Sequence, residues 1–162
     1  MKLIILSGKS NCGKTASLNL LHNMLLNTNT VVEESKISVG NPSQQDYVYL
    51  MNCSCTNKKI VISTWGDYPY LLNDYCSKYI DYDTVICACN MNFMRNTVHK
   101  PFEDAMRFDN LTTVILKTPE SDINKYATSN NACATYLLNL IKHFGIISVS
   151  YTHLRAHETR SN

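Results

Sequence analysis

The sequence lacks any apolar run that approaches the ~20 residues of a membrane-spanning helix. The apolar start Met1–Leu6 leads directly into a glycine-rich segment, so no signal peptide is expected. An excess of one charge is also missing, because 15 Lys and Arg face 13 Asp and Glu, a net charge of +2. This charge is too small and too scattered to suggest a nucleic-acid surface. We therefore expect one soluble domain, with neither a membrane nor a nucleic acid among its partners.

The seven cysteines lack the spacing of a zinc site. The nearest pairs are Cys53 with Cys55 and Cys87 with Cys89, whereas zinc sites usually use C-x₂₋₄-C. A spacing of two on a strand places both thiols on one face. Because the count is odd and a free Cys behaves as a small buried hydrophobe, we predict packing rather than disulfides or metal ligation.

What the sequence does contain is a stretch, Gly8–Thr15, that fits G-x-x-x-x-G-K-[ST], the phosphate-binding loop. Before it, the continuous apolar run Lys2–Leu6 predicts a buried parallel strand. After it, Thr15–Leu26 predicts a helix with leucines on one stripe. A helix N-terminus that follows a strand and a glycine turn forms an anion site, because its free N–H groups and its dipole favour negative charge.

Each residue type in the loop has a chemical reason. Gly8 and Gly13 let the backbone curl round a phosphate, and residues 9–13 present successive N–H groups as a nest. Lys14 places a positive charge on the outer phosphates, and Thr15 offers a hydroxyl to Mg²⁺. The predicted binding set is Gly8, Lys9, Ser10, Asn11, Cys12, Gly13, Lys14, Thr15 and Ala16. A helix N-terminus can lower the pKa of a thiol, but we interpret Cys12 as a variable position of the motif.

On these residues the chain resembles the P-loop NTPase superfamily, over about residues 2–26. The resemblance implies a three-layer α/β fold with a mainly parallel sheet. It also implies that the ligands are a nucleoside triphosphate, with ATP favoured, and Mg²⁺. A phosphate loop further implies an ATP-rich, reducing compartment, so we expect a cytoplasmic protein.

Strands alternate with helices along the remaining chain, as in an α/β domain. The predicted strands are 47–53, 59–64, 84–89 and 111–116, and the predicted helices are 70–79, 101–108 and 132–143. The linker between the first two strands is too short for a parallel crossover, so about 47–64 should form an antiparallel hairpin. The polar segment 27–46 is predicted as a loop, compatible with a short strand over 36–39. It is either an ordinary connection or a segment that folds over the nucleotide.

The hairpin ends in Ser63-Thr64-Trp65-Gly66-Asp67, a layout similar to that of GTPases. In GTPases the equivalent strand ends in D-x-x-G, where the Asp holds Mg²⁺ through water and the Gly N–H touches the γ-phosphate. Here Ser63 stands at the Asp position, and Gly66 matches, so that we add Gly66 to the predicted nucleotide-binding set. Because a hydroxyl binds Mg²⁺ more weakly than a carboxylate, we predict that Asp67 and Thr15 serve the metal. The alternative is that Gly66 and Asp67 form a plain turn.

Basic residues at 90–107 include Arg95, His99, Lys100 and Arg107. In kinases such residues close over the phosphates, and in ATPases one can act as an arginine finger. Arg95 is our candidate, because its segment directly follows the carboxyl end of a predicted strand. The alternative is solvated charge on a surface loop. The predicted catalytic residues are therefore Lys14, Asp67 and Arg95.

Three functions stay open at this point. Mg²⁺-dependent ATP hydrolysis is favoured by the hairpin and its terminal turn. A small-molecule or nucleotide kinase is less favoured, because the sequence shows no acidic general base paired with an arginine-rich lid. A non-catalytic nucleotide sensor or assembly module, with an unidentified protein partner, is kept open by Ser63. GTP is less favoured than ATP, because the place of N-K-x-D holds Leu116-Lys117-Thr118-Pro119.

The C-terminal segment needs a separate explanation, because residues 149–159 resemble a translated sequencing adapter. We therefore expect a single P-loop NTPase domain over 1–147, with a native chain that could continue further, and a non-native tail over 148–162. On this interpretation His153 and His157 carry no metal hypothesis, and the tail should be dispensable.

Overall fold

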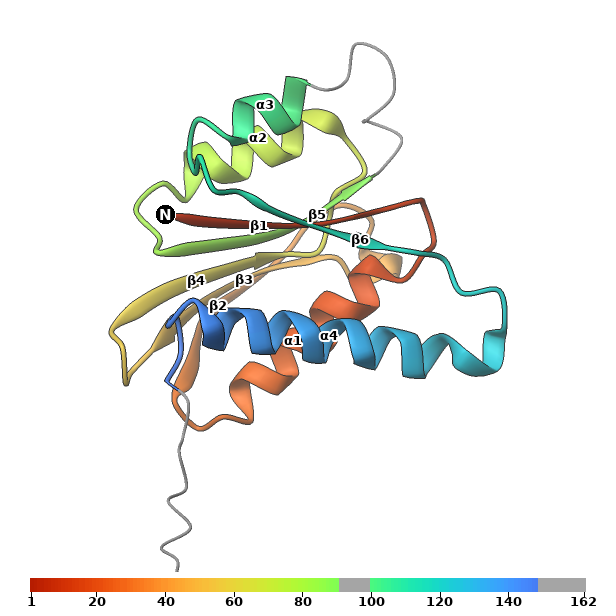
Figure 1. The fold of residues 1–162 in the computed structure, drawn as a ribbon, viewed down its shortest axis with the longest axis horizontal. Helices are drawn as coiled ribbons and strands as arrows, with labels where there is room; N and C mark the ends of the chain where they lie inside the picture. The colour runs from red at the N-terminus through yellow and green to blue at the C-terminus, as the bar shows by residue number, and fades with distance from the viewer. Residues whose placement is uncertain (91–99, 149–162) are drawn as a thin grey trace, which may run out of the picture.

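Six strands form one mixed sheet in the order β2-β3-β4-β5-β1-β6 (Figure 1). The structure is a computed structural model that describes residues 1–90 and 100–148. The strands are β1 (Lys2–Gly8), β2 (Val31–Ser38), β3 (Tyr47–Cys53), β4 (Lys58–Ser63), β5 (Thr84–Asn90) and β6 (Thr113–Lys117). The helices are α1 (Lys14–Leu26), α2 (Pro69–Lys78), α3 (Lys100–Ala105) and α4 (Tyr126–His143). Short 3-10 turns cover Pro42–Gln44 and Ile123–Lys125.

The sheet is covered on both faces, as Figure 1 shows. Ile4 and Leu6 of β1 pack toward α1 and α4, whereas Leu3 and Ile5 pack toward α2 and α3. Each of these four side chains is fully buried, and burial of one such side chain stabilises the fold by about 1.5–3 kcal/mol. The continuous apolar run in β1 therefore reflects a strand buried on both faces. The predicted α/β class with a mostly parallel sheet is confirmed.

The predicted hairpin is also confirmed, because β3 pairs antiparallel with β4, with Val48 opposite Ser63. The other pairings of β4, β5, β1 and β6 are parallel. Strand β5 lies between β4 and β1, so the segment that follows β4 reaches the phosphate loop across the end of β5. Strand β2 adds a second antiparallel pairing, with β3.

The prediction of a loop over 27–46 is wrong for its central part, which forms β2. This strand lies at the edge of the sheet, and most of its side chains are exposed or only half-buried. It therefore has no alternating apolar pattern that would reveal it in the sequence. A register shift between Glu33 and Ser35 and the charged residues Glu34 and Lys36 disfavour pairing of this edge strand with another chain.

Several element boundaries also differ from those predicted, most of all the start of α4. Helix α4 begins at Tyr126, whereas residue 132 was predicted. The sequence did not reveal the first two turns, because they are polar and largely exposed and show no apolar stripe. Helix α3 ends at Ala105 instead of 108, and β6 begins at Thr113 instead of 111. These shifts leave the order of strands and helices as predicted.

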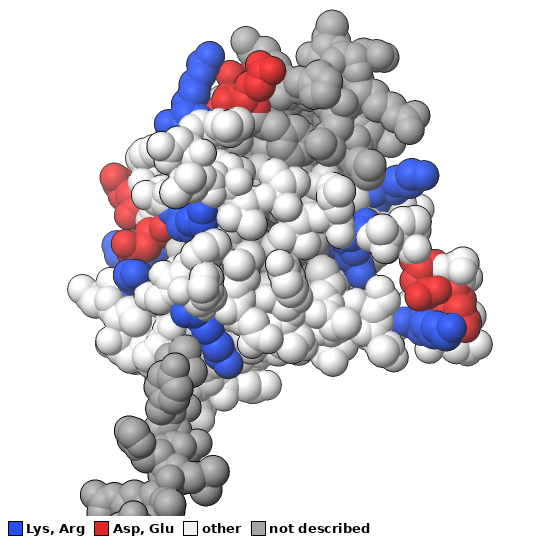
Figure 2. Space-filling model, in the orientation of Figure 1, with Lys and Arg blue, Asp and Glu red and all other residues white. Residues whose placement is uncertain are grey.

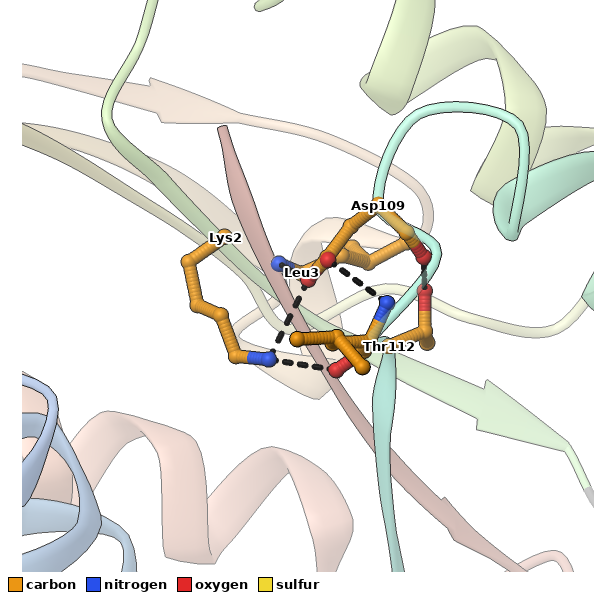
Figure 3. Close-up of polar contacts among 5 residues, drawn as sticks. Lys2, Leu3, Asp109 and Thr112 are labelled. Carbon is orange, nitrogen blue, oxygen red and sulfur yellow. Dashed lines mark hydrogen bonds and ion pairs between the residues drawn. The ribbon is translucent and has the colours of Figure 1, made fainter.

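At the ends of the strands opposite the phosphate loop, Asp109 connects two segments of the chain by hydrogen bonds (Figure 3). Its Oδ2 accepts from the Leu3 backbone N–H at 2.8 Å and lies 3.3 Å from Lys2 Nζ. Its Oδ1 accepts from the Leu111 N–H at 2.9 Å, and its carbonyl accepts from the Thr112 hydroxyl at 2.6 Å. This one carboxylate therefore ties the start of β1 to the segment that leads into β6.

Figure 2 shows acidic and basic side chains interspersed over the face that it draws. Within residues 1–90 and 100–148, no helix is both long and apolar enough to cross a bilayer. Arg95, His99 and the predicted tail over 149–162 lie outside the described residues. The interpretation of these segments therefore stays a prediction.

Candidate functional site

The predicted phosphate loop connects the end of β1 to the start of α1, at the centre of the sheet. Gly13 caps the helix with φ +91°, and Asn11 also has a positive φ of 60°. The first turn of α1 holds no acidic residue. Its N–H groups and dipole therefore face the pocket without a competing carboxylate from their own turn, as an anion site requires.

Close packing explains both motif glycines. A Cβ on Gly8 would lie 2.5 Å from Cys12 Sγ and 2.7 Å from the Lys117 carbonyl oxygen. A Cβ on Gly13 would lie 2.2 Å from Asn130 Oδ1, and the positive φ disfavours a side chain there in any case. Cys12 was interpreted as a variable position of the motif, and the structure adds that its side chain is buried beneath Gly8.

Lys14 folds along the loop that precedes it. Its ammonium donates to the carbonyl oxygens of Gly8 at 3.0 Å and of Lys9 at 2.8 Å. Both acceptors belong to the loop, so they hold the positive charge beside the helix N-terminus. The side chain of Lys9, in contrast, is exposed and does not line the pocket.

A pocket of about 680 Å³ opens at this end of the sheet. A volume of this size falls within the range of small-molecule and cofactor sites, roughly 300–1,000 Å³. The lining includes six residues of the predicted binding set, which are Ser10, Asn11, Gly13, Lys14, Thr15 and Ala16. Gly66 and Asp67 also line it, as predicted for the segment after β4. The connection between β2 and β3 contributes Gln44, Gln45 and Asp46, so this segment reaches the pocket.

Asp46 is the acidic residue nearest the Thr15 hydroxyl that the structure describes, and the sequence did not reveal it. The Thr15 hydroxyl lies 3.2 Å from Asp46 Oδ1 and 3.3 Å from the Thr64 carbonyl oxygen. The Thr64 hydroxyl lies 3.2 Å from the same Asp46 oxygen and accepts from the Tyr47 N–H at 2.9 Å. A carboxylate, two hydroxyls and a carbonyl oxygen therefore meet beside the phosphate loop.

Sheet topology explains how Asp46 reaches the site. It directly precedes β3, and β3 runs antiparallel to β4. The start of an antiparallel strand lies at the edge where its parallel neighbours end. The predicted site residues all follow strands, whereas Asp46 directly precedes one. The sequence signal for Asp46 is its place directly before the first strand of an antiparallel hairpin.

Hydrogen bonds to neighbouring segments fix the backbone around Asp46. Gln45 has φ +56°, a left-handed conformation that costs a non-glycine residue roughly 1–2 kcal/mol. Its carbonyl accepts from the Asn19 side chain of α1 at 3.3 Å. The Asp46 carbonyl accepts from the Val39 N–H at 3.1 Å. Strain of this kind persists where surrounding contacts over-determine a conformation, and it is concentrated at functional sites.

Burial sets the protonation behaviour of Asp46, which is only 3% exposed. Loss of solvent raises the pKa of its carboxyl group, and the negative charge of Asp67 adds to this rise. The hydroxyl groups of Thr15 and Thr64 act against it, because they hydrogen-bond to the charged form. A cation placed against Asp46 would relieve this unfavourable burial of charge.

The predicted metal residue Asp67 lies on the rim of the same pocket and is exposed. Its Oδ2 accepts from the indole N–H of Trp65 at 3.2 Å. Gly66 is buried against β5, since a Cβ there would lie 2.2 Å from the Ala88 carbonyl oxygen. A packing role for Gly66 therefore exists beside any contact with a phosphate.

Ser63, which aligns with the GTPase metal ligand, faces away from the pocket. It is fully buried and does not line the pocket. Among the described residues, its hydroxyl has no hydrogen-bond partner. Thr64, one residue later, points to the opposite side and contacts Asp46. The alternation of side chains along a strand explains why only the second of these neighbours can serve the site.

Of the basic residues considered over 90–107, Arg107 lies among the described residues and does not line the pocket. Arg107 is exposed and pairs with Asp104 at 3.5 Å, on α3. Lys117 is buried at the end of β6, where its Nζ lies 3.2 Å from the Ser129 hydroxyl of α4. Its Cε packs close to Gly13, so Lys117 supports the phosphate loop from behind.

Three comparisons, with family models, with curated proteins and with solved structures, find no match to this chain. The loop, the pocket and the carboxylates described above therefore carry the functional conclusion.

Proposed function

We propose that this chain binds a nucleoside triphosphate together with Mg²⁺ in the pocket at the end of β1 and hydrolyses it. One observation carries the proposal. The Lys14 ammonium, the Thr15 hydroxyl and the Asp46 carboxylate belong to one pocket at the N-terminus of a helix whose first turn is free of acidic residues. These are the positive charge, the metal-binding hydroxyl and the carboxylate that phosphoryl chemistry uses.

The donor set at Thr15 fits the proposed metal. Mg²⁺ prefers hard oxygen ligands, keeps several waters and takes only one or two protein carboxylates. Thr15 Oγ1, Asp46 Oδ1 and the Thr64 carbonyl oxygen are such ligands, and they lie within one hydrogen-bonded group. When bound, the metal would neutralise charge on the phosphate oxygens. Asp46 would orient the Thr15 hydroxyl and the water shell, and Asp67 would face the same shell from the rim.

The residues of the loop would supply the remaining electrostatic stabilisation. The N–H groups of the first helical turn would hold phosphate oxygens, and Lys14 would exchange its bonds to the Gly8 and Lys9 carbonyls for the terminal phosphate. A charge-assisted bond to phosphate is stronger than a bond to a neutral carbonyl. ATP is the proposed nucleotide. Guanine recognition stays unfavoured, because the segment at Lys117 lacks an Asp in the place that N-K-x-D requires.

The test compares wild-type protein with Lys14→Ala and with Lys9→Ala. Lys9 is a matched control, because it is a lysine of the same loop whose exposed side chain does not line the pocket. We expect Lys14→Ala to abolish Mg·ATP binding and turnover with the fold intact by circular dichroism, whereas Lys9→Ala should change affinity less than about threefold. Unchanged affinity and turnover in Lys14→Ala would overturn the proposal.

The same assay distinguishes the two alternative functions. Release of inorganic phosphate without an acceptor indicates hydrolysis. A phosphorylated acceptor, in the presence of candidate small molecules and nucleotides, indicates a kinase. Tight binding that depends on Lys14 but gives no turnover indicates a nucleotide sensor with a protein partner.

A further inference from the structure

A second chemically active group lies at the far edge of the sheet from the phosphate loop, in the turn that joins β3 and β4. Figure 1 shows this turn and the C-terminal end of α4 on one side of the molecule and the phosphate loop on the other. The Sγ atoms of Cys53 and Cys55 lie 3.1 Å apart. Cys53 is the last residue of β3 and is fully buried, whereas Cys55 is exposed in the turn.

We propose that Cys53 and Cys55 form a thiol–disulfide exchange site whose substrates are low-molecular-weight disulfides such as glutathione disulfide. The exposed thiol is the attacking group, and the buried thiol resolves the intermediate. This assignment depends on the contact between the two sulfur atoms and on their unequal exposure, and it is independent of the nucleotide site.

The surrounding contacts hold the two thiols together. Ser54, which separates them, is fixed by its N–H and its hydroxyl, both of which donate to the Thr30 carbonyl at 2.8 and 3.0 Å. The Thr56 hydroxyl donates to the Ile146 carbonyl at 2.7 Å, and Lys58 Nζ donates to the Gly145 carbonyl at 3.0 Å. The turn is therefore anchored to β2 and to the end of α4 on both sides of the thiol pair.

The environment of Cys55 favours its thiolate. The hydroxyl of Ser148, the first residue of the predicted tail, lies 3.2 Å from Cys55 Sγ, and this hydrogen bond is the largest of the effects that lower the pKa of Cys55 to about 6. The contacts with Cys53 and Thr30 add to it. Lys58 is the charged residue paired with Cys53 across the hairpin, and its ammonium is directed to Gly145.

The reaction balances in two steps. The Cys55 thiolate attacks one sulfur of the disulfide R–S–S–R, forms the mixed disulfide Cys55–S–S–R and releases R–S⁻. Cys53 loses its proton to water, and its thiolate attacks Cys55 Sγ, so that a Cys53–Cys55 disulfide forms and the second R–S⁻ leaves. The two protein thiols are oxidised by two electrons, and the small disulfide is reduced to two thiols.

The expected rate advantage is moderate. At pH 6 a thiol with a pKa near 6 is about half thiolate, whereas an ordinary cysteine with a pKa of about 8.5 is roughly 0.3% thiolate. The less basic thiolate is also the weaker nucleophile, which removes most of this difference. We therefore expect Cys55 to react about tenfold faster at pH 6 than an ordinary exposed thiol.

The test treats the full chain at pH 6 with glutathione disulfide, traps the remaining thiols by alkylation and analyses the peptides by mass spectrometry. We expect a Cys53–Cys55 disulfide to form before Cys133 reacts, because burial raises the pKa of that half-buried thiol. Cys53→Ala should stop at the Cys55–glutathione mixed disulfide, and Cys55→Ser should leave Cys53 unmodified. Lys14→Ala should react as the wild type does, since its change lies at the other edge.

Two results would overturn the proposal. One is a wild-type chain that accumulates the mixed disulfide at Cys55 without closing the second bond. The other is a Cys133 that is oxidised as fast as Cys55. If Cys53→Ala does not fold, a comparison of Cys55→Ser with the wild type still tests the proposal, because only the wild type should lose two alkylatable thiols.

Discussion

Asp46 and Asp109 lie at opposite ends of the strands of the same sheet, and both are largely shielded from water. They differ in the hydrogen-bond donors and charges that surround them. Burial alone would raise the pKa of Asp109, but two backbone N–H groups and the Lys2 ammonium reverse this and hold it below its usual value. Asp46 receives only hydroxyl groups and has the negative charge of Asp67 nearby, so its pKa is raised. The contrast indicates that Asp109 is satisfied by the fold itself, whereas the surroundings of Asp46 suit a bound cation.

The largest effect should come from Asp46→Asn. Asn keeps an oxygen that can accept from Thr15 and Thr64 but carries no charge to orient a metal shell. We expect Mg·ATP affinity to fall by about tenfold, the contribution of the metal, and turnover to fall by roughly 10²-fold or more, the scale of a lost acid–base group. Steady-state phosphate release measures this.

Asp67→Asn is the matched control for that experiment, because Asp67 is a second carboxylate of the same pocket but is exposed and bonded to Trp65. Asp67 was the carboxylate that the sequence predicted to serve the metal. On the geometry we expect Asp67→Asn to lower turnover by less than about tenfold. The reverse ranking of the two variants would return the metal role to Asp67.

A smaller effect, on stability rather than activity, should follow Asp109→Asn. The amide nitrogen of Asn cannot accept a hydrogen bond, so either the Leu3 or the Leu111 N–H loses its partner. We expect the free energy of unfolding in urea to fall by about 1.5–3 kcal/mol, with turnover unchanged in the folded protein. Asp104→Asn removes only the exposed pair with Arg107 and should cost less than about 1 kcal/mol. Equal losses in both variants would contradict the role given to Asp109.

The contribution of Asp109 should also depend on pH. Because its pKa is lowered in the folded protein, the carboxylate stabilises the fold above the unfolded value of about 3.9. This stabilisation is lost as the pH falls through the folded pKa. The stability difference between wild type and Asp109→Asn should therefore be largest near neutral pH and shrink below about pH 4. A difference that stays constant down to pH 3 would show that the charge of Asp109 does not stabilise the fold.

The smallest effect should be that of Asp46→Asn on stability without metal. Burial of the Asp46 charge opposes folding, and its hydrogen bonds to Thr15 and Thr64 offset this. We expect the free energy of unfolding to stay within about 1 kcal/mol of wild type or to rise, as at functional sites that trade stability for activity. A loss as large as that of Asp109→Asn would remove the contrast between the two carboxylates.

Much of the fold was predictable because its strongest signals are local. Strand β1 is a continuous apolar run, and the short linker before β4 forces a hairpin. Strand β2 was not predictable, because an edge strand with exposed faces has no hydrophobic period. The first third of α4 was missed for the same reason.

The same distinction between local and long-range signals applies to the residues of the site. Gly8–Thr15 could be read from the sequence, since a contiguous motif carries its own spacing. Asp46 could not, because its contact with Thr15 joins residues 31 positions apart and depends on the direction of β3. Likewise, the contact between Cys53 and Cys55 depends on a turn that leaves one thiol buried and the other exposed.

The central claim is that Asp46 completes a metal-dependent nucleotide site, and calorimetric titration with ATP in Mg²⁺ and in EDTA tests it most directly. We expect wild-type affinity to fall by at least about tenfold in EDTA, or about 1.4 kcal/mol. This dependence on Mg²⁺ should nearly disappear in Asp46→Asn and persist in Asp67→Asn. A full Mg²⁺ dependence in Asp46→Asn, equal to that of wild type, would contradict the account.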